Sequence, residues 1–248
     1  RLLAVLGASQ ALGDFLVAHP ERLTALAPDR AWDARQEPGA GEALQRAVRD
    51  ALGQAAPVNA DPSDSDERPP HPGDAAVSRA TAALRRAYRD RLTAIVADDL
   101  TSADPIEHVP TVCRRMTELA DAALDAALLV ARAVVGPQAD DVALAVIAMG
   151  KTGARELNYI SDVDVVYVVG PTHEACGAQE PISEERLVEV GTHVATELAH
   201  VVSATAPEPP LWPLDTALRP EGKDGALVRT LDSHLAYYRR WAASWEFQ

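Results

Sequence analysis

Cysteine, membrane-length apolar runs and a leader-like start are all missing or scarce in this chain, and each absence restricts the function. The 248 residues include two cysteines, Cys113 and Cys176. They lie too far apart to form a metal-binding or redox motif, so we expect a reducing, cytoplasmic setting. No uninterrupted apolar run approaches the roughly 20 residues of a membrane span. No basic segment followed by an apolar one opens the chain. We therefore expect no membrane role.

Positive charge and aromatic residues are also scarce. Lysine and arginine number 23 against 37 aspartates and glutamates, which gives a formal net charge of −14. A surface this acidic repels a phosphate backbone, so general nucleic-acid binding is disfavoured, and phosphoryl chemistry would need bound cations. Aromatic residues make up 4% of the chain and apolar residues 47%. The apolar residues are mostly Ala, Leu and Val, which favours helix and suffices for a real core.

Helical periodicity dominates the first half of the chain. Predicted helices cover residues 1–30 (ending near Pro20), 32–52, 75–99 and 106–135, and Gly136-Pro137 stops the last. Five prolines and a cluster of acids near residues 55–75 predict a mobile surface loop, better explained as a linker than as a functional segment. We predict an α-helical region over residues 1–135.

The predicted helix over residues 75–99 carries a basic face on an acidic protein, made of Arg85, Arg86, Arg89 and Arg91. This face could contact a phosphate or an acidic partner. The alternative is a solvated face paired with neighbouring aspartates, and it is favoured because exposed charges on helices are common. The aspartates in question are Asp90, Asp98 and Asp99.

The second half of the chain alternates predicted strands and helices. A helix is expected from Ser183 to about Ser203, a strand over 211–220, and a last helix from Asp232 or Ser233. We predict a catalytic domain over residues 136–231 and the start of a C-terminal helical region over 232–248. The chain begins and ends in mid-pattern, so we expect it to be a piece of a longer protein.

The stretch from Asp141 to Gly170 carries the chemistry. An apolar run is cut by Gly150 and Gly153, a short helix-prone piece follows at 155–159, and a second apolar run then begins. This pattern predicts a strand, a glycine turn, a short helix and another strand.

Three aspartates are candidate metal ligands. Asp162 and Asp164 begin the second apolar run, and residues at i and i+2 on a strand share a face. Asp215 follows fifty-one positions after Asp164, on the next predicted strand. Magnesium prefers oxygen ligands, and two such ions can bind the attacking and the departing oxygen at one phosphorus. The aspartates thus predict a site for Mg²⁺ or Mn²⁺, with two ions.

The residues before the aspartates predict phosphate contacts. Gly150 and Gly153 would let backbone N–H groups approach phosphate oxygens, and Lys151 adds a positive charge. Acidic pairs at strand ends are nevertheless frequent on surfaces, and glycines are frequent in ordinary turns. The residues alone leave both interpretations open.

A longer string of residues resembles a known signature. Gly150, eleven residues and then Asp162-x-Asp164 after an apolar strand is similar to the pattern of the nucleotidyltransferase superfamily with a DNA-polymerase-β-like core. The full string from Met149 to Asp164, M-G-K-T-G-A-R-E-L-N-Y-I-S-D-V-D, resembles one family within it, the bifunctional glutamine synthetase adenylyltransferase/adenylyl-removing enzyme. Ala154 stands where that family usually has glycine.

The resemblance implies an α+β fold and a set of site residues. An N-terminal α-helical region would pack on a nucleotidyltransferase mixed sheet with helices, followed by the start of a C-terminal helical segment. The catalytic metal ligands that it implies are Asp162, Asp164 and Asp215. The nucleotide- and phosphate-binding residues that it implies are Gly150, Lys151, Gly153, Ser161 and Arg219.

The resemblance also implies a reaction. The sequence Glu156-Leu157-Asn158-Tyr159 is similar to that of the N-terminal, adenylyl-removing half of the family. That half would take AMP from a tyrosine of glutamine synthetase, with phosphate as acceptor and ADP as product, and so regulate nitrogen assimilation. The implied partners are glutamine synthetase, phosphate, adenine nucleotide and the nitrogen-signalling PII protein. The alternatives are AMP transfer from ATP onto glutamine synthetase, or a non-catalytic regulatory module that binds a partner.

Overall fold

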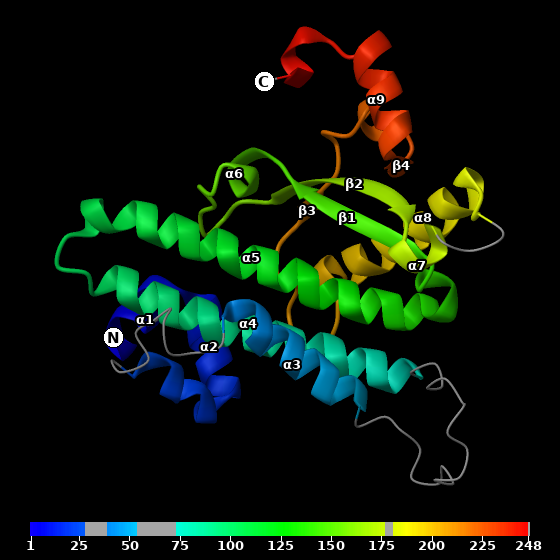
Figure 1. The fold of residues 1–248 in the computed structure, drawn as a ribbon. Coiled ribbons are helices and arrows are strands. Elements are labelled where there is room, and N and C mark those ends of the chain that lie inside the picture. The colour runs from blue at the N-terminus through cyan, green and yellow to red at the C-terminus, as the bar shows by residue number, and fades with distance from the viewer. Residues whose placement is uncertain (28–38, 54–72, 177–180, 248) are drawn as a thin grey trace, which may run out of the picture.

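The fold was taken from a computed structural model, which describes residues 1–27, 39–53, 73–176 and 181–247. The chain is α+β, as expected: a helical region lies against a small mixed sheet of four strands (Figure 1). The loop predicted near 55–75 falls outside the described residues except at its end. Among the described helices, none has an apolar stretch long enough to cross a membrane.

The helical segment expected over residues 1–30 is divided into three pieces, α1 (Leu2–Ala8), α2 (Gln10–Ala18) and a 3-10 helix, η1 (Pro20–Leu26). The first break lies at Ser9, whose backbone is extended and whose Oγ accepts a hydrogen bond from the Leu12 N–H, so it caps α2; the second lies at His19. These pieces bury a small separate cluster around Phe15 against Val96 of a later helix.

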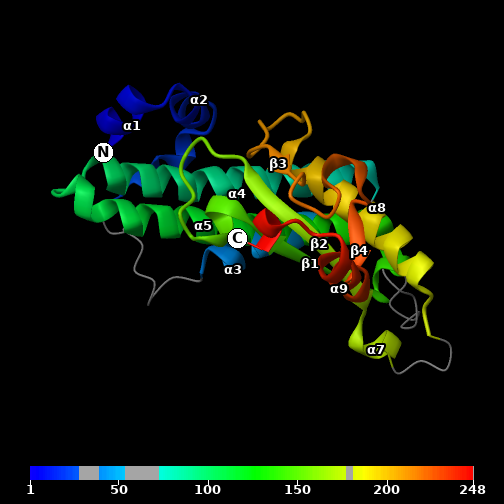
Figure 2. The same cartoon turned by 90° about the horizontal axis from the view of Figure 1, so that it is seen from above.

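Three longer helices follow, α3 (Ala40–Gly53), α4 (Asp74–Leu100) and α5 (Pro105–Val135). The expected start of the first at residue 32 lies outside the described residues. Asp104 caps the start of helix α5, where its carboxylate accepts from the Glu107 N–H, and Gly136, with φ +75°, follows its last residue. It stays unbroken although Pro110 lies in its second turn. Helices α4 and α5 run alongside each other (Figures 1 and 2).

The sheet is built around β2 (Val163–Pro171). Strand β1 (Val142–Ala148) pairs with it antiparallel along one edge. Two short parallel strands share the other edge, β3 (Leu214–Asp215) at the start of β2 and β4 (Val228–Thr230) near its end. The predicted strand over 211–220 was therefore too long, because the chain turns directly after Asp215. Strand β4 was not predicted, since three residues are too few to show a period.

The remaining described helices are mostly short, except for the 20-residue α8. They are η3 (Gly136–Ala139), α6 (Gly150–Gly153), α7 (His173–Cys176), α8 (Glu184–Ser203), η4 (Gly222–Asp224), α9 (Leu231–Arg240) and η5 (Ser244–Phe247). Ser183 caps α8 as predicted, with its Oγ accepting from the Arg186 N–H. Helix α9 is capped by Thr230 instead of Asp232 or Ser233.

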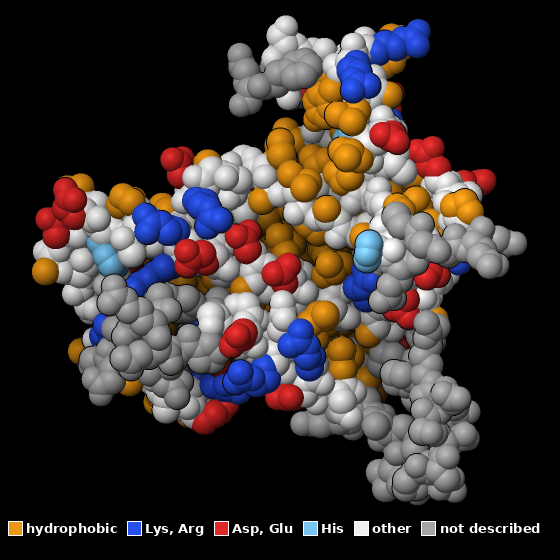
Figure 3. Space-filling view, viewed as in Figure 1, with side chains coloured by type: hydrophobic (Ala, Val, Ile, Leu, Met, Phe, Trp, Pro, Cys, Tyr) orange, Lys and Arg blue, Asp and Glu red, His pale blue; other side chains and the backbone are white. Residues whose placement is uncertain are grey.

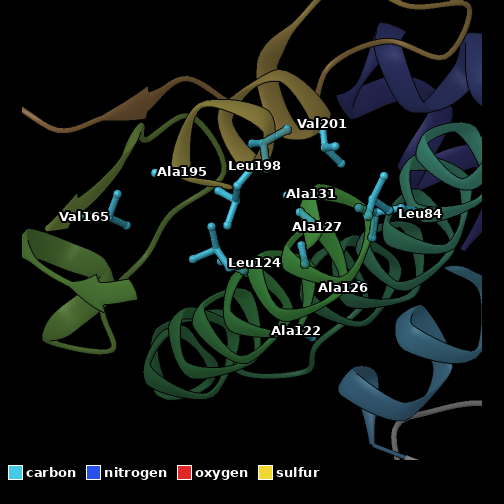
Figure 4. Packing of buried hydrophobic residues seen from close by; sticks show 14 of the residues in the cluster. Leu84, Ala122, Leu124, Ala126, Ala127, Ala131, Val165, Ala195, Leu198 and Val201 are labelled. Atoms are coloured by element: carbon cyan, nitrogen blue, oxygen red, sulfur yellow. The ribbon is translucent and has the colours of Figure 1, made fainter. Parts of the chain in front are cut away.

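The main core lies between α5, α8 and the inner face of the sheet (Figure 4). Alanines such as Ala127 and Ala131 on α5 leave room for Leu198 of α8. At Gly191 of α8, a Cβ would lie 2.8 Å from Val169 Cγ2, so glycine allows the helix to approach the sheet closely. One continuous cluster joins residues on both sides of position 135, and the predicted division into units there and at 231 stays a prediction.

The outer face of the sheet is covered only in part. Helix α9 lies on the side of the sheet opposite α5 (Figure 1). Between α6 and α9, apolar side chains reach the surface over β1 (Figure 3), and Ile147 there is 44% exposed.

Three of the four arginines on the basic face of α4 are bonded to a distant segment of the chain, so the expectation of a solvated face was wrong for Arg85, Arg86 and Arg89. The Arg85 side chain is fully buried because it falls on the same helical stripe as Thr81 and Tyr88. It, Arg86 and Arg89 contact the segment that follows α8. The expected aspartate partners bond to other residues: Asp90 to Arg22, Asp98 to Arg1 and Arg115, and Asp99 to Tyr159. The charge of Arg91, which belongs to the basic face, also acts on Asp90.

Candidate functional site

Three carboxylates converge at the start of β2. Asp162, Asp164 and Asp215 each offer an oxygen atom, and these atoms all lie within 4.8 Å of one another. Asp164 and Asp215 are register partners on the parallel strands β2 and β3, and Asp162 directly precedes β2. Asp162 is exposed and the other two are half-buried, so the cluster opens toward solvent on one side.

Backbone hydrogen bonds on both edges of β2 fix this convergence. On the β3 edge, the Val163 N–H donates to Pro213 O at 3.0 Å. On the β1 edge, the Met149 N–H donates to Asp164 O at 2.9 Å. The Ala217 N–H donates to Asp215 Oδ1 at 2.7 Å, which orients that carboxylate and turns the chain out of the sheet. Asp164 on β2 therefore lies between β1 on one edge and β3 on the other, and both are hydrogen-bonded to β2.

Gly150 passes directly over the Asp164 carboxylate. Its φ is +51°, and a Cβ at this position would lie 2.4 Å from Asp164 Oδ2. Any side chain would fill the space above that oxygen. At Gly153, a Cβ would lie 2.7 Å from Ala148 O, so this glycine is required by close backbone packing. An open carboxylate oxygen in a set of three such ligands fits a hard divalent cation such as Mg²⁺ or Mn²⁺.

The short helix lies earlier than predicted. Helix α6 is formed by Gly150–Gly153, and residues 155–159, which we expected to be helical, form a loop. Arg155 has φ +61°, which ends the helical path. Ala154 has φ −76° and ψ −7°, an ordinary right-handed conformation, so alanine fits here without strain although the related family usually has glycine.

The loop that leads to Asp162 is anchored on the helical region. Leu157 is buried, and its N–H donates to Thr117 Oγ1 of α5 at 3.4 Å. The Tyr159 hydroxyl donates to Asp99 Oδ2 at the end of α4, at 2.7 Å. Our sequence reasoning missed both anchors. Their signal was an apolar and an aromatic residue, two positions apart, inside a polar stretch.

Lys151 and Ser161 lie next to each other beside the carboxylates. Lys151 Nζ donates to Ser161 Oγ at 3.0 Å, and the Ser161 hydroxyl donates to Asn158 Oδ1 at 2.7 Å. The Lys151 charge also acts on Asp164. The structure thus brings two of the predicted phosphate-binding residues to the metal-ligand candidates.

The pKa of the Asp164 carboxyl is raised above its ordinary value. Partial burial is the largest cause, and the charges of Asp162 and Asp215 add to it, while Lys151 opposes it. The cluster therefore concentrates negative charge that one lysine offsets only in part. A bound divalent cation would relieve this repulsion.

Arg219 organises the loop after β3. Its guanidinium donates to Thr216 O, Lys223 O and Gly225 O at 2.9 to 3.1 Å. These hydrogen bonds remain within its own loop, and Asp215 is not among their acceptors. Its predicted contact with a phosphate stays a prediction.

The sequence is similar to that of long bacterial enzymes named bifunctional glutamine synthetase adenylyltransferase/adenylyl-removing enzyme. It is 43% identical over 251 residues to the protein of Bifidobacterium longum subsp. infantis, 44% over 253 to that of Mycolicibacterium smegmatis and 40% over 248 to that of Streptomyces avermitilis. Each match covers the whole of this chain and 21–22% of the relative, so the chain spans about a fifth of their length. The family model for glutamate-ammonia ligase adenylyltransferase matches residues 1–248. The chain therefore belongs to the glutamate-ammonia ligase adenylyltransferase family.

Proposed function

We propose that this chain is a metal-dependent nucleotidyltransferase unit that removes AMP from a tyrosine of glutamine synthetase by phosphorolysis. The observation that carries the proposal is the convergence of Asp162, Asp164 and Asp215 within 4.8 Å. Family membership and the names of the relatives support glutamine synthetase as the protein substrate. The resemblance of the sequence Glu156–Tyr159 to the adenylyl-removing half of the family supports the direction of AMP removal.

The three carboxylates would hold Mg²⁺ or Mn²⁺, as two ions. The ions supply positive charge that stabilises the attacking and departing oxygens of a phosphoryl transfer. Asp164 and Asp215 are fixed by strand pairing, and the exposed Asp162 completes the set on the solvent side. The chain's own contribution is to hold the ligands so that little reorganisation is needed.

The reaction balances without a base from the protein. An oxygen of hydrogenphosphate forms a bond to the phosphorus of the tyrosine-bound AMP, and the bond from phosphorus to the tyrosine oxygen breaks. The proton that hydrogenphosphate carries ends on the tyrosine oxygen, and the other product is ADP. Lys151 and Ser161 would orient the phosphates. Gly150, Gly153 and Arg219 would shape the space around them.

A second direction is favoured by one observation: the names of the relatives join adenylyl transfer to adenylyl removal. One carboxylate site can serve both reactions, because each moves an adenylyl group at one phosphorus; the transfer breaks the α–β phosphate bond of ATP and releases pyrophosphate, so it is a separate reaction and not the reverse of phosphorolysis. In that case the chain would attach AMP from ATP to glutamine synthetase. For either direction, we also propose that the chain acts in the cytoplasm and that it contacts the PII protein.

Two assays with purified chain distinguish the directions. In the first, adenylylated glutamine synthetase, phosphate and Mg²⁺ are supplied and ADP is measured. In the second, unmodified glutamine synthetase receives labelled ATP, and incorporation is measured. We expect ADP release that is lost in Asp162→Asn and Asp164→Asn. Unchanged ADP release in either variant would contradict the proposal, and label incorporation without ADP release would favour the transfer direction.

A metal titration tests the site without glutamine synthetase. A ligand that binds only the native state raises its stability, so Mg²⁺ or Mn²⁺ should raise the melting temperature of the wild type. The effect should disappear in Asp164→Asn. If neither ion shifts the transition while the chain still binds a nitrogen-signalling protein, the chain is a non-catalytic binding module.

A further inference from the structure

Helix α4 contacts both the loop that leads to Asp162 and the segment that leads to Asp215. Near its C-terminal end, Asp99 is bonded to Tyr159, three residues before Asp162. Near its middle, Arg85, Arg86 and Arg89, here called the arginine clamp, contact the segment 204–210 that leads into β3. We propose that α4 positions the metal ligands through these two contacts. The inference rests on the proposed function, because it concerns how a metal site is held.

The first contact restricts the loop before Asp162. Tyr159 donates to Asp99 Oδ2 at 2.7 Å, and burial together with the Asp99 carboxylate raises the pKa of Tyr159, which keeps the hydroxyl a donor. Within the loop, Asn158 Oδ1 accepts from the Ile160 N–H at 3.3 Å and from the Ser161 hydroxyl at 2.7 Å. The loop is thus bonded to itself up to the residue before Asp162. Leu157 anchors it on α5, and Tyr159, which is nearer to Asp162 in the sequence, anchors it on α4.

The centre of the arginine clamp is Arg85. It donates to four carbonyls at the end of α8 and beyond: His200 O at 3.4 Å, Val201 O at 2.8 and 3.1 Å, Ala204 O at 2.8 Å and Glu208 O at 2.7 Å. A guanidinium offers five donors in a rigid planar arrangement, so several fixed acceptors restrict its position strongly. The end of α8 is therefore held directly on α4.

The other two arginines extend the contact toward β3. Arg86 Nη1 lies 2.9 Å from Glu208 Oε1, and His19 Nε2 lies 3.3 Å from the same oxygen. Arg89 Nη2 donates to Pro209 O at 2.8 Å and to Pro210 O at 2.9 Å. From Pro210 the chain reaches β3 within a few residues, so the arginine clamp determines where the strand that carries Asp215 begins.

The two contacts act on one rigid element. Arg85 and Asp99 are 14 positions apart on a continuous helix, which corresponds to about 21 Å at 1.5 Å per residue. Asp164 is held on its other edge by β1, which α4 does not position: the Met149 N–H donates to Asp164 O at 2.9 Å. The arrangement of the three carboxylates therefore depends on where α4 lies relative to β2. Metal sites require ligands placed within about 0.5 Å, so small shifts of α4 should alter metal affinity.

Tyr159→Phe tests the first contact by removing one oxygen. The matched control is Tyr167→Phe, since the Tyr167 hydroxyl is buried without a hydrogen-bond partner in the described part of the chain. Mn²⁺ affinity is measured by titration, and the melting temperature without metal is measured beside it. We expect Tyr159→Phe to weaken Mn²⁺ binding by about threefold or more, less than the 10–100-fold typical of partners bonded directly to a ligand. Tyr167→Phe should leave the affinity unchanged.

A double-mutant cycle shows whether the effect passes through Asp99. Asp99→Asn should weaken Mn²⁺ binding in the wild-type background and have little further effect beside Tyr159→Phe. Fully additive effects would overturn the role of this hydrogen bond in positioning.

Arg89→Met tests the second contact, because this arginine is only half-buried and the variant is more able to fold than one at Arg85. We expect weaker Mn²⁺ binding, with partial recovery in Arg89→Lys, which keeps a donor. If Tyr159→Phe and Arg89→Met lower the melting temperature while both bind Mn²⁺ like the wild type, the contacts are merely structural and the inference is wrong. If the wild type itself binds no Mn²⁺, the proposed function fails as well, so the two failures are distinguishable.

Discussion

Asp164 and Asp215 stand opposite each other on two parallel strands, although fifty-one positions separate them in the sequence. Register partners on parallel strands present their side chains on the same face, so strand pairing itself brings the two carboxylates together. The pairing of β3 is only two residues long. The site therefore depends on a short strand that needs support from outside the sheet.

Asp164→Asn should stabilise the metal-free protein while abolishing metal binding. The substitution removes one of three repelling charges and keeps the shape of the side chain. We expect an increase in the free energy of unfolding of about 0.2–1 kcal/mol, the range for solvent-accessible charge pairs. Chemical denaturation without metal measures it. A destabilised Asp164→Asn protein would show that Asp164 makes a structural contact that outweighs the repulsion.

The pH dependence of the metal-free protein follows from the raised pKa of Asp164. The folded state binds this proton more tightly than the unfolded state, whose aspartate has an ordinary value near 3.8. The contribution to stability is therefore fully present below that value and is lost as the pH rises through the folded pKa. Mn²⁺ binding should show the opposite trend, because the ligand must be ionised. Melting curves of wild type and Asp164→Asn between pH 4 and 7 isolate this contribution, which should be missing in the variant.

Gly150→Ala should damage both the fold and the site. The new Cβ would lie 2.4 Å from Asp164 Oδ2, and the left-handed backbone is itself unfavourable for alanine by about 1–2 kcal/mol. We expect a loss of at least that much stability and much weaker Mn²⁺ binding. Gly7→Ala in α1 is the control, since an added Cβ there would contact nothing within 4 Å beyond its own stretch of helix, and alanine favours helix. Equal behaviour of the two variants would contradict the close approach at Gly150.

Lys151→Gln should separate metal binding from phosphate binding. Removing a positive charge beside Asp164 should leave Mn²⁺ affinity equal or slightly higher. The concentration of phosphate needed for half-maximal ADP release should rise by about tenfold, the effect of about 1.4 kcal/mol. The exposed Lys223→Gln offers the same charge change in the loop after β3 and should leave phosphate dependence unchanged. An unchanged phosphate requirement in Lys151→Gln would remove Lys151 from the proposed site.

Gly191→Ala tests how α8 lies on the sheet, independently of the metal. The Cβ would lie 2.8 Å from Val169 Cγ2 and 3.2 Å from Val228 Cγ1, and overpacking of this kind costs about 1–3 kcal/mol. Calorimetry should show the loss, and Val169→Ala in the same chain should recover part of it. If Gly191→Ala is as stable as the wild type, the helix can shift outward and the packing here is looser than the structure indicates.

Local patterns in the sequence predicted the main elements well where the signal extends over many residues. Helices α4, α5 and α8 have long apolar stripes and clear end signals, and their predicted bounds lie close to the observed ones. Strands β1 and β2 are continuous apolar runs. The two short strands, β3 and β4, exist only because β2 offers them an edge, so no local period marks them.

The contacts between distant segments could not be predicted. The basic residues of α4 were interpreted as solvated because charge usually stays on the surface. The carbonyls that bury Arg85 come from more than 100 residues later and carry no sequence signature. The short helix was predicted at 155–159 but lies at 150–153, for a related reason. Tyr159 bonds to Asp99, and this tertiary hydrogen bond overrides the local helical propensity of 155–159.

The burial of Arg85 has a consequence for the order of folding. Its acceptors Val201 O and Glu208 O follow it by 116 and 123 positions, so during synthesis the guanidinium exists long before the carbonyls that satisfy it. A buried charge without partners is strongly unfavourable, so α4 must keep this face open to water until α8 has formed and ended. The helical region and the sheet should therefore acquire their final packing together, late in folding, in a single cooperative transition.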